Sequence, residues 1–273
     1  MEIKAADVAK LRKMTGAGMM DCKNALTEAN GDYERAQEII REKGKLVSAK
    51  RADRTATEGD VVAQIVDGKK GYMLCLACET DFVAKNADFL ASANELLDIA
   101  VKNDVADIEA LKATVVDGKS VESIVTEKSG QTGEKVELAF YAKVEADQVV
   151  AYVHTNKKLG ALIGFSPAVS AEVAKDVAMQ ATAMAPVAIS AADTPAEVIA
   201  KERKIGREQA AQEGKPEAML DKIAEGKVQK FLKENTLLSQ TLVKDNKLTV
   251  EQYIRNDNPA AKVVAYKRFS LND

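Results

Sequence analysis

The chain has 273 residues, 46% of them apolar, with a formal net charge of -3 and a pI near 5.6. This length can bury more than one hydrophobic core, so we expect at least two modules. The slightly acidic balance argues against a sequence-independent nucleic-acid binder, and the absence of Trp argues against base-stacking platforms. No stretch approaches the ~18 apolar residues of a membrane span and no export signal is apparent, so we expect a cytoplasmic protein without membrane contact.

The first module, residues 1–44, is predicted to be a small three-helix bundle. Apolar spacing and glycine stop signals place its helices at residues 6–14, 19–29 and 33–43, and the last is expected to end at Gly44. Met19 and Met20 are adjacent, so both cannot face one thin core. Either they form an adaptable binding surface, or one of them fills the core. A polar linker, residues 45–59, is expected to follow.

Beyond the linker, a predicted strand at residues 71–78 leads to a helix at residues 87–101. The corner between them contains Thr80, Asp81 and Phe82. Corners held by a rigid scaffold are places where binding residues concentrate. Phe82 therefore either fills a pocket of a partner or folds back to cap its own helix.

An internal repeat bears on this choice, because residues 61–71 resemble residues 149–160 with one extra residue in the second copy. Each copy reads as strand, turn, strand and long helix, the second helix being at residues 171–184. The second corner, Gly164-Phe165-Ser166-Pro167-Ala168, lacks the Thr-Asp-Phe tip. Both copies should need such a tip if it only turned a strand into a helix, so the difference favours a function for it.

The two copies, joined by helices at 108–113 and 121–128 and a strand at 135–144, predict an α+β fold with antiparallel sheets. We expect one core subdomain at residues 60–146 and a second at 147–190 together with 234–273.

Residues 191–233 are predicted to form an inserted coiled-coil hairpin that projects from the core. Thr194-Pro195-Ala196-Glu197 has the pattern of a capping box, and Gly214-Lys215-Pro216 separates two helices. The arm has either a merely structural role or a functional one. The functional alternative is that the arm or the core binds a partner or mediates self-association. Residues 261–269 alternate as a terminal strand does.

Catalytic and metal-binding patterns are weak. Cys75 and Cys78 lack further ligands for zinc, and along a strand they face opposite ways, so we expect structural thiols and no metal. His154 is the single histidine, which excludes a His-dependent triad around a second one and favours a surface hydrogen bond. Thr15-Gly16-Ala17-Gly18 lacks the Gly-Lys-Ser/Thr ending of a phosphate loop.

Six blocks of sequence, in order along the chain, carry a resemblance to a known family. They are Thr15-Gly16-Ala17-Gly18-Met19-Met20-Asp21-Cys22-Lys23, Cys78-Glu79-Thr80-Asp81-Phe82-Val83, His154 with Gly160-Ala161-Leu162, Ala178-Met179-Gln180, Pro195-Ala196-Glu197-Val198, and Lys230-Phe231-Leu232-Lys233-Glu234 with Val250-Glu251-Gln252-Tyr253. The chain resembles bacterial elongation factor Ts, the nucleotide exchange factor for elongation factor Tu.

The resemblance implies elongation factor Tu as partner, a ubiquitin-associated-like first module, and no cofactor or direct nucleic-acid contact. It implies that the corner wedges into the partner and disturbs its Mg²⁺ site. The contact residues that it implies are Thr80, Asp81, Phe82 and Val83 at the corner, Leu11, Met19 and Met20 in the bundle, and His154, Lys158 and Gly160 in the second hairpin. The alternatives are a redox enzyme using Cys75 and Cys78, and a passive binding module that does not accelerate nucleotide release.

Overall fold

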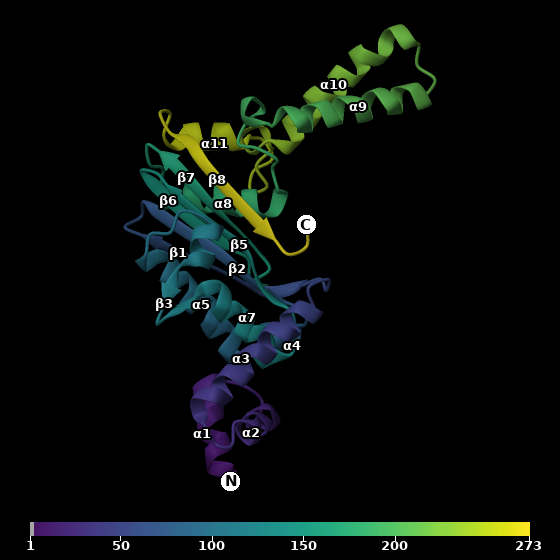
Figure 1. Ribbon diagram of the computed structural model, residues 1–273. Helices are drawn as coiled ribbons and strands as arrows, with labels where there is room; N and C mark the ends of the chain where they lie inside the picture. Colours follow the sequence, from purple (N-terminus) through teal and green to yellow (C-terminus); the bar gives the residue numbers. More distant parts are fainter. Residues whose placement is uncertain (1–2) are drawn as a thin grey trace.

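The computed structural model of the chain describes residues 3–273; Met1 and Glu2, part of the expected first module, lie outside the described residues. Helices combine with small antiparallel sheets, so the expected α+β class is confirmed. Figure 1 shows a helical bundle at the N-terminal end, a core of sheets and helices, and a helical arm at the far end. Across residues 3–273, no helix combines the length and apolar character needed to cross a membrane.

The N-terminal bundle consists of α1 (Ala5–Thr15), α2 (Met19–Glu28) and the first half of α3 (Tyr33–Lys50). Helix α1 ends where Gly16 takes a left-handed conformation, φ 68°, which glycine tolerates best. Asp32 begins α3 by accepting hydrogen bonds from two backbone N–H groups. Leu11 and Leu26 are fully buried at the centre of the bundle.

The prediction that the third helix ends at Gly44 is wrong. Helix α3 continues to Lys50, so residues 45–50 of the expected linker are helical. Gly44 lies where α3 crosses α7 (Val121–Thr132), and a Cβ on Gly130 would lie 2.5 Å from the Cα of Gly44. The two glycines let the helices approach closely, and this packing outweighs the ~1 kcal/mol that glycine costs within a helix. A continuous helix therefore joins the bundle to the core.

The first sheet has the antiparallel order β1-β2-β5. Its strands are β1 (Glu58–Val66), β2 (Lys70–Cys78) and β5 (Val136–Glu145). Helix α5 (Ala87–Lys102) lies against β1 and β2, and α7 lies against β5. Leu74 and Leu76 of β2 pack with Phe89 and Leu96 of α5 in this layer. The shorter connecting elements are α4 (Asp81–Ala84), α6 (Ile108–Ala113), β3 (Val115–Val116) and β4 (Lys119–Ser120).

The second sheet has the antiparallel order β6-β7-β8. Its strands are β6 (Gln148–Val153), β7 (Leu159–Ser166) and β8 (Lys262–Ser270), and β8 confirms the predicted terminal strand. Ile163 and Phe165 of β7 pack with Val177 of α8 (Ala171–Met184), the helix that covers this sheet. The remaining elements on this side are α11 (Val250–Asp257) and two short 3-10 helices, η1 (Ala191–Asp193) and η2 (Leu237–Ser239).

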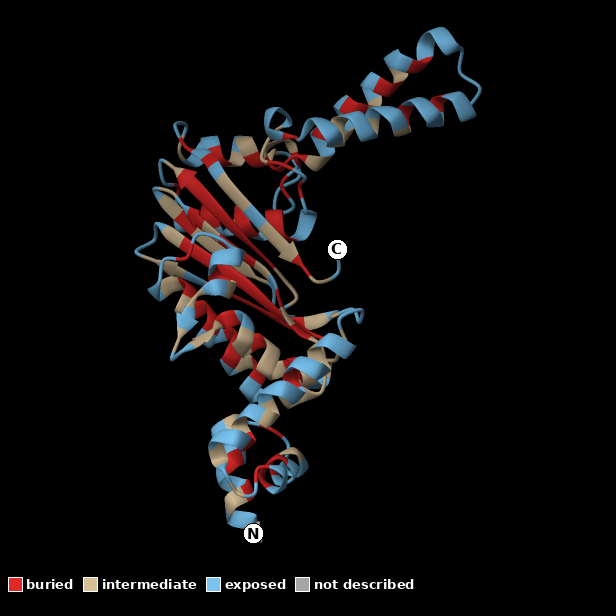
Figure 2. Cartoon of the chain, viewed as in Figure 1, coloured by how far each residue is buried: buried red, intermediate tan, exposed pale blue. Residues whose placement is uncertain are grey.

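The two sheets pack together through a separate apolar cluster that includes Met73, Cys75 and Leu162. Val61 and Val149 occupy equivalent positions of the repeat, and each donates a backbone hydrogen bond to the hairpin tip of the other copy. The N–H of Val61 donates to the carbonyl of Lys157, and that of Val149 to the carbonyl of Gly68, both at 2.7 Å. Each hairpin tip thus binds the first strand of the other copy. Figure 2 shows the buried residues running along the second strands, β2 and β7.

The arm is a pair of helices, α9 (Ala196–Gln212) and α10 (Glu217–Asn235), that extends away from the sheets. Gly206 allows close contact, since a Cβ there would lie 3.3 Å from the Cα of Ala224. The predicted capping box is wrong: Pro195 occupies the N-cap position without a side-chain cap. The hydroxyl of Thr194 instead donates to the carbonyl of Ser190 at 3.1 Å, because the preceding 3-10 turn brings that acceptor within reach.

Candidate partner-binding surface

The corner between β2 and α5 carries an almost fully exposed aromatic side chain. Thr80 caps the short helix α4, its hydroxyl oxygen accepting a hydrogen bond from the N–H of Val83 at 3.5 Å. Val83 packs against the core and Ala84 is buried, so one face of α4 is anchored. Phe82 lies away from that face with 86% of its surface exposed. The alternative that Phe82 folds back onto its own helix is therefore wrong.

Asp81, beside Phe82, is paired within the same turn. Its Oδ2 lies 2.6 Å from the Nζ of Lys85. The ammonium group of Lys85 holds the pKa of Asp81 below its ordinary value, so the carboxylate is charged at neutral pH. Sequence reasoning missed Lys85, although its spacing of four residues from Asp81 is the spacing of a helical ion pair.

The equivalent corner of the second copy is tied down. The side-chain amide of Gln148 donates to the carbonyl of Val169 at 3.0 Å and accepts from its N–H at 2.9 Å. The N–H of Ser170 donates to Asp257 at 2.8 Å. Phe165, near this corner, is fully buried. Only the first of the two corners projects an aromatic side chain, which agrees with the contrast in sequence.

The second hairpin lies beside the first corner. A groove of about 610 Å³ between them is lined by Asp81 and Lys85 on one side and by tip residues 155–158 on the other. His154 is exposed at this tip, its Nδ1 3.3 Å from the hydroxyl of Tyr152. Lys158 Nζ lies 2.5 Å from the Oε1 of Glu58. Two of the segments expected to bind a partner therefore meet on one surface.

Two of the expected contact residues are buried instead. Leu11 has no exposed surface, because it fills the centre of the bundle. Gly160 lies inside the sheet packing, where a Cβ would be 2.9 Å from the carbonyl oxygen of Tyr152 and 3.1 Å from the Sδ of Met73. The expectation of direct contacts by Leu11 and Gly160 is corrected: both support the shape of the segments around them.

The methionine pair of the bundle is exposed, Met19 by 43% and Met20 by 64%. The core positions of α2 are taken by Cys22 and Leu26. The alternative that one methionine fills the core is wrong. Both side chains are accessible to a partner.

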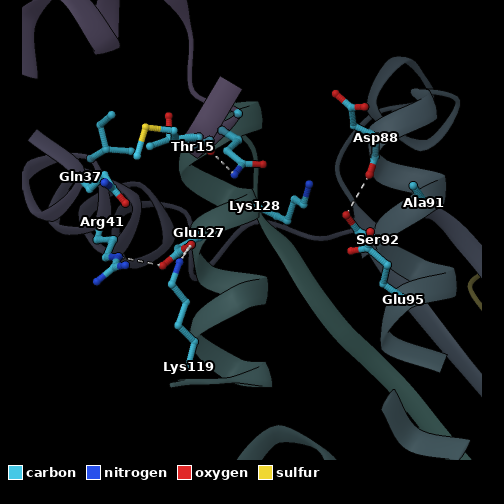
Figure 3. Close-up of a pocket in the computed structure, with 14 residues that line it drawn as sticks. Thr15, Gln37, Arg41, Asp88, Ala91, Ser92, Glu95, Lys119, Glu127 and Lys128 are labelled. Carbon is cyan, nitrogen blue, oxygen red and sulfur yellow. Dashed lines mark hydrogen bonds and ion pairs between the residues drawn. The ribbon is translucent and has the colours of Figure 1, made fainter. Parts of the chain in front are cut away.

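A groove of about 330 Å³ separates the bundle from the core helices (Figure 3). Gln131 of α7 is one of its lining residues, and its Nε2 donates to the carbonyl of Thr15 at 2.5 Å. Arg41 of α3 pairs with Glu127 of α7 at 3.3 Å. These contacts fix the bundle to α7. The remaining lining residues mix both charges: Met14, Gly16, Gln37, Ile40, Asp88, Ala91, Ser92, Glu95, Lys119 and Lys128.

The cysteine pair has the character of structural thiols. Cys78 faces the layer between the first sheet and its helices, whereas Cys75 faces the second sheet. Burial raises the pKa of Cys75 far above its ordinary value and that of Cys78 to about 12, so both stay protonated at neutral pH. Among residues 3–273, no cluster of three or more His, Cys, Asp or Glu side chains could hold a metal ion.

Comparison with known proteins assigns this architecture to a family. A family model described as elongation factor TS matches residues 79–273. The chain belongs to the elongation factor Ts family. A protein named elongation factor Ts from Porphyromonas gingivalis is 46% identical over 273 residues, covering 100% of this chain and 99% of its own. Those of Christiangramia forsetii and Methylobacillus flagellatus are 48% and 47% identical, covering 99% and 93% of their own length.

The expected resemblance is thereby confirmed. Elongation factor Ts proteins are nucleotide exchange factors for elongation factor Tu in translation elongation. The family match includes the corner, the second hairpin and the arm, whereas the N-terminal bundle lies before its first matched residue. The full-length relatives cover the bundle as well.

Proposed function

We propose that this chain accelerates GDP release from elongation factor Tu by inserting the corner of residues 80–83 into the partner. The observation that carries the proposal is the side chain of Phe82, 86% exposed on a turn whose other face is anchored. Burying a Phe side chain stabilises a complex by roughly 1.5–3 kcal/mol, and a pocket of the partner would provide that burial.

Asp81 gives the same corner an electrostatic role. Its carboxylate is charged and lies next to the ring that enters the partner. Insertion of a negative group near a nucleotide site disturbs the residues that position Mg²⁺, and loss of the ion removes the largest positive charge facing the diphosphate. Because the factor binds the nucleotide-free state better, linkage makes bound factor weaken nucleotide affinity by the same ratio.

The flanking surfaces serve as anchors in this proposal. Met19 and Met20 contact the G domain, and His154 with Lys158 contacts a β-barrel domain of the partner. The exposure of both methionines and of His154 supports these roles. The corner and the second hairpin lie on either side of one groove, so a single partner could engage both. The site of action is the cytosol, where translation takes place.

Stopped-flow release of labelled GDP tests the wedge. Phe82→Ala should reduce the maximal release rate at least roughly tenfold, equivalent to 1.4 kcal/mol of lost transition-state stabilisation. The concentration for half-maximal rate should rise only modestly, because the anchors remain. The melting temperature should not fall, since the side chain is exposed.

Val115→Ala is the matched control, because Val115 is an apolar residue with 65% of its surface exposed on the β3–β4 hairpin. It should leave both the release rate and the melting temperature unchanged. A wild-type maximal rate for Phe82→Ala would refute the wedge, whereas failure of the unaltered chain to accelerate GDP release would favour a passive binding module.

A further inference from the structure

The exposed corner is bound by the carboxylate of Glu134, a residue far away in sequence. Glu134 lies in the loop between α7 and β5. Its Oε2 accepts hydrogen bonds from the N–H groups of Glu79 and Thr80 at 3.1 and 3.0 Å, and its Oε1 accepts one from the Thr80 hydroxyl at 2.6 Å. One side chain therefore binds three donors of the segment that begins α4.

Glu79 in turn binds Lys135, the neighbour of Glu134 in the same loop, and Arg51. Its Oε1 accepts from the N–H of Lys135 at 2.6 Å, and both of its oxygens lie 2.8 Å from an Nη of Arg51. The Lys135 N–H and the Arg51 guanidinium hold the pKa of Glu79 below its ordinary value. Only 16% of the Glu79 side chain is exposed. Arg51 directly follows α3, the helix that carries the N-terminal bundle.

We propose that Arg51, Glu79 and Glu134 form a clasp that positions the tip of residues 80–83 and links it to α3. The importance of this clasp for exchange rests on the proposed function. A helix of one turn is not stable alone, because nucleation is unfavourable. Hydrogen bonds to charged groups are the stronger ones, and a tip that is already ordered loses less entropy when it enters a partner.

Hydrogen exchange tests the clasp without any partner. In Glu134→Ala, the amides of Glu79 and Thr80 should exchange roughly tenfold faster, since a hydrogen bond to a charged acceptor contributes at least that factor. Glu134→Gln should recover part of the protection, because its amide oxygen still accepts. Glu137→Ala is the matched control: Glu137 is an acid of β5 that pairs with the Lys135 ammonium at 3.1 Å. It should leave both amides protected.

GDP release tests the consequence for function. Glu134→Ala should lower the maximal rate several-fold while changing the half-maximal concentration less than about twofold, with Glu134→Gln between it and wild type. Circular dichroism of each variant checks that it is folded.

The hydrogen-exchange and GDP-release experiments distinguish the clasp from the wedge. Unchanged protection of Glu79 and Thr80 in Glu134→Ala overturns the clasp whatever the release rate. Lost protection with an unchanged maximal rate overturns its role in exchange, provided that Phe82→Ala is slow in the same assay. Lost protection together with a wild-type rate for Phe82→Ala supports the clasp and counts against the proposed function.

Discussion

The Phe82 ring remains in water although the turn that holds it is well anchored. Thr80 caps that turn and Val83 packs into the core, so the backbone around the ring is defined by its neighbours. Isolated apolar side chains are common on protein surfaces. The equivalent corner of the second repeat copy, however, projects no such side chain. The free energy of burying the Phe82 ring therefore remains available when a complex forms.

Asp81 is expected to act through charge. Asp81→Ala should slow GDP release at saturation, because it removes the group proposed to disturb the partner's Mg²⁺ site. Chelating Mg²⁺ should restore most of this loss, whereas it should not restore Phe82→Ala, whose steric contribution is still missing. The measurement is labelled-GDP release with and without EDTA.

Asp98→Ala provides the matched control, because Asp98 is an exposed acid on α5. It should behave as wild type in both conditions. An equal effect of EDTA on Asp81→Ala and Phe82→Ala would contradict the division between charge and shape.

At the scale of helices, the crossing of α3 and α7 determines where the bundle lies. Gly130→Ala places a methyl group 2.5 Å from the Cα of Gly44, so the helices must separate. Overpacking of this kind costs roughly 1–3 kcal/mol. We expect a lower free energy of unfolding in urea and weaker association with elongation factor Tu, because the bundle and its methionines tilt away from the core.

The same substitution at Gly226 should have the opposite sign. Gly226 lies within α10, and nothing lies within 4 Å of a Cβ built there. Gly226→Ala should therefore stabilise the protein by about 0.5–1 kcal/mol through helix propensity alone. If Gly130→Ala were as stable as Gly226→Ala, the close crossing would not be what fixes the bundle.

For the molecule as a whole, stability towards acid should depend on Asp104. The Nζ of Lys143 at 2.8 Å, the hydroxyl of Tyr72 and the Nζ of Lys70 hold the pKa of Asp104 well below its ordinary range. A depressed pKa stabilises the fold above the unfolded value of about 3.9 and loses this contribution as pH falls through the folded value. Asp104→Asn should thus lower the melting temperature at pH 7 more than at about pH 2.

Asp60 should respond in the opposite direction. Only 3% of it is exposed, and its Oδ1 has no hydrogen-bond partner among residues 3–273. Burial raises its pKa, so its charge weakens the fold at neutral pH and protonation relieves that cost. Asp60→Asn should raise the melting temperature at pH 7 and give less gain in acid. Equal shifts at both pH values, for either variant, would contradict the assigned pKa direction.

Local sequence determined much of the framework. Periodicity and the internal repeat predicted the hairpins, their following helices and the terminal strand, because these features depend on residue spacing. The contrast between the two corners also predicted that Phe82 has a role of its own. Six blocks of sequence, in order along the chain, indicated the family, which the comparisons confirm.

Tertiary structure decided the rest, because long-range contacts compete with local preferences. Gly44 carries a helix-stop signal, yet α3 continues because Gly130 of α7 offers a close packing surface. Leu11 is one of the contact residues that the resemblance implies, yet it is buried in the bundle core. No spacing rule relates Glu134 to Thr80, which lie 54 residues apart. Local spacing determined which segments fold and which corner differs, and only the folded chain determined which side chains hold that corner in place.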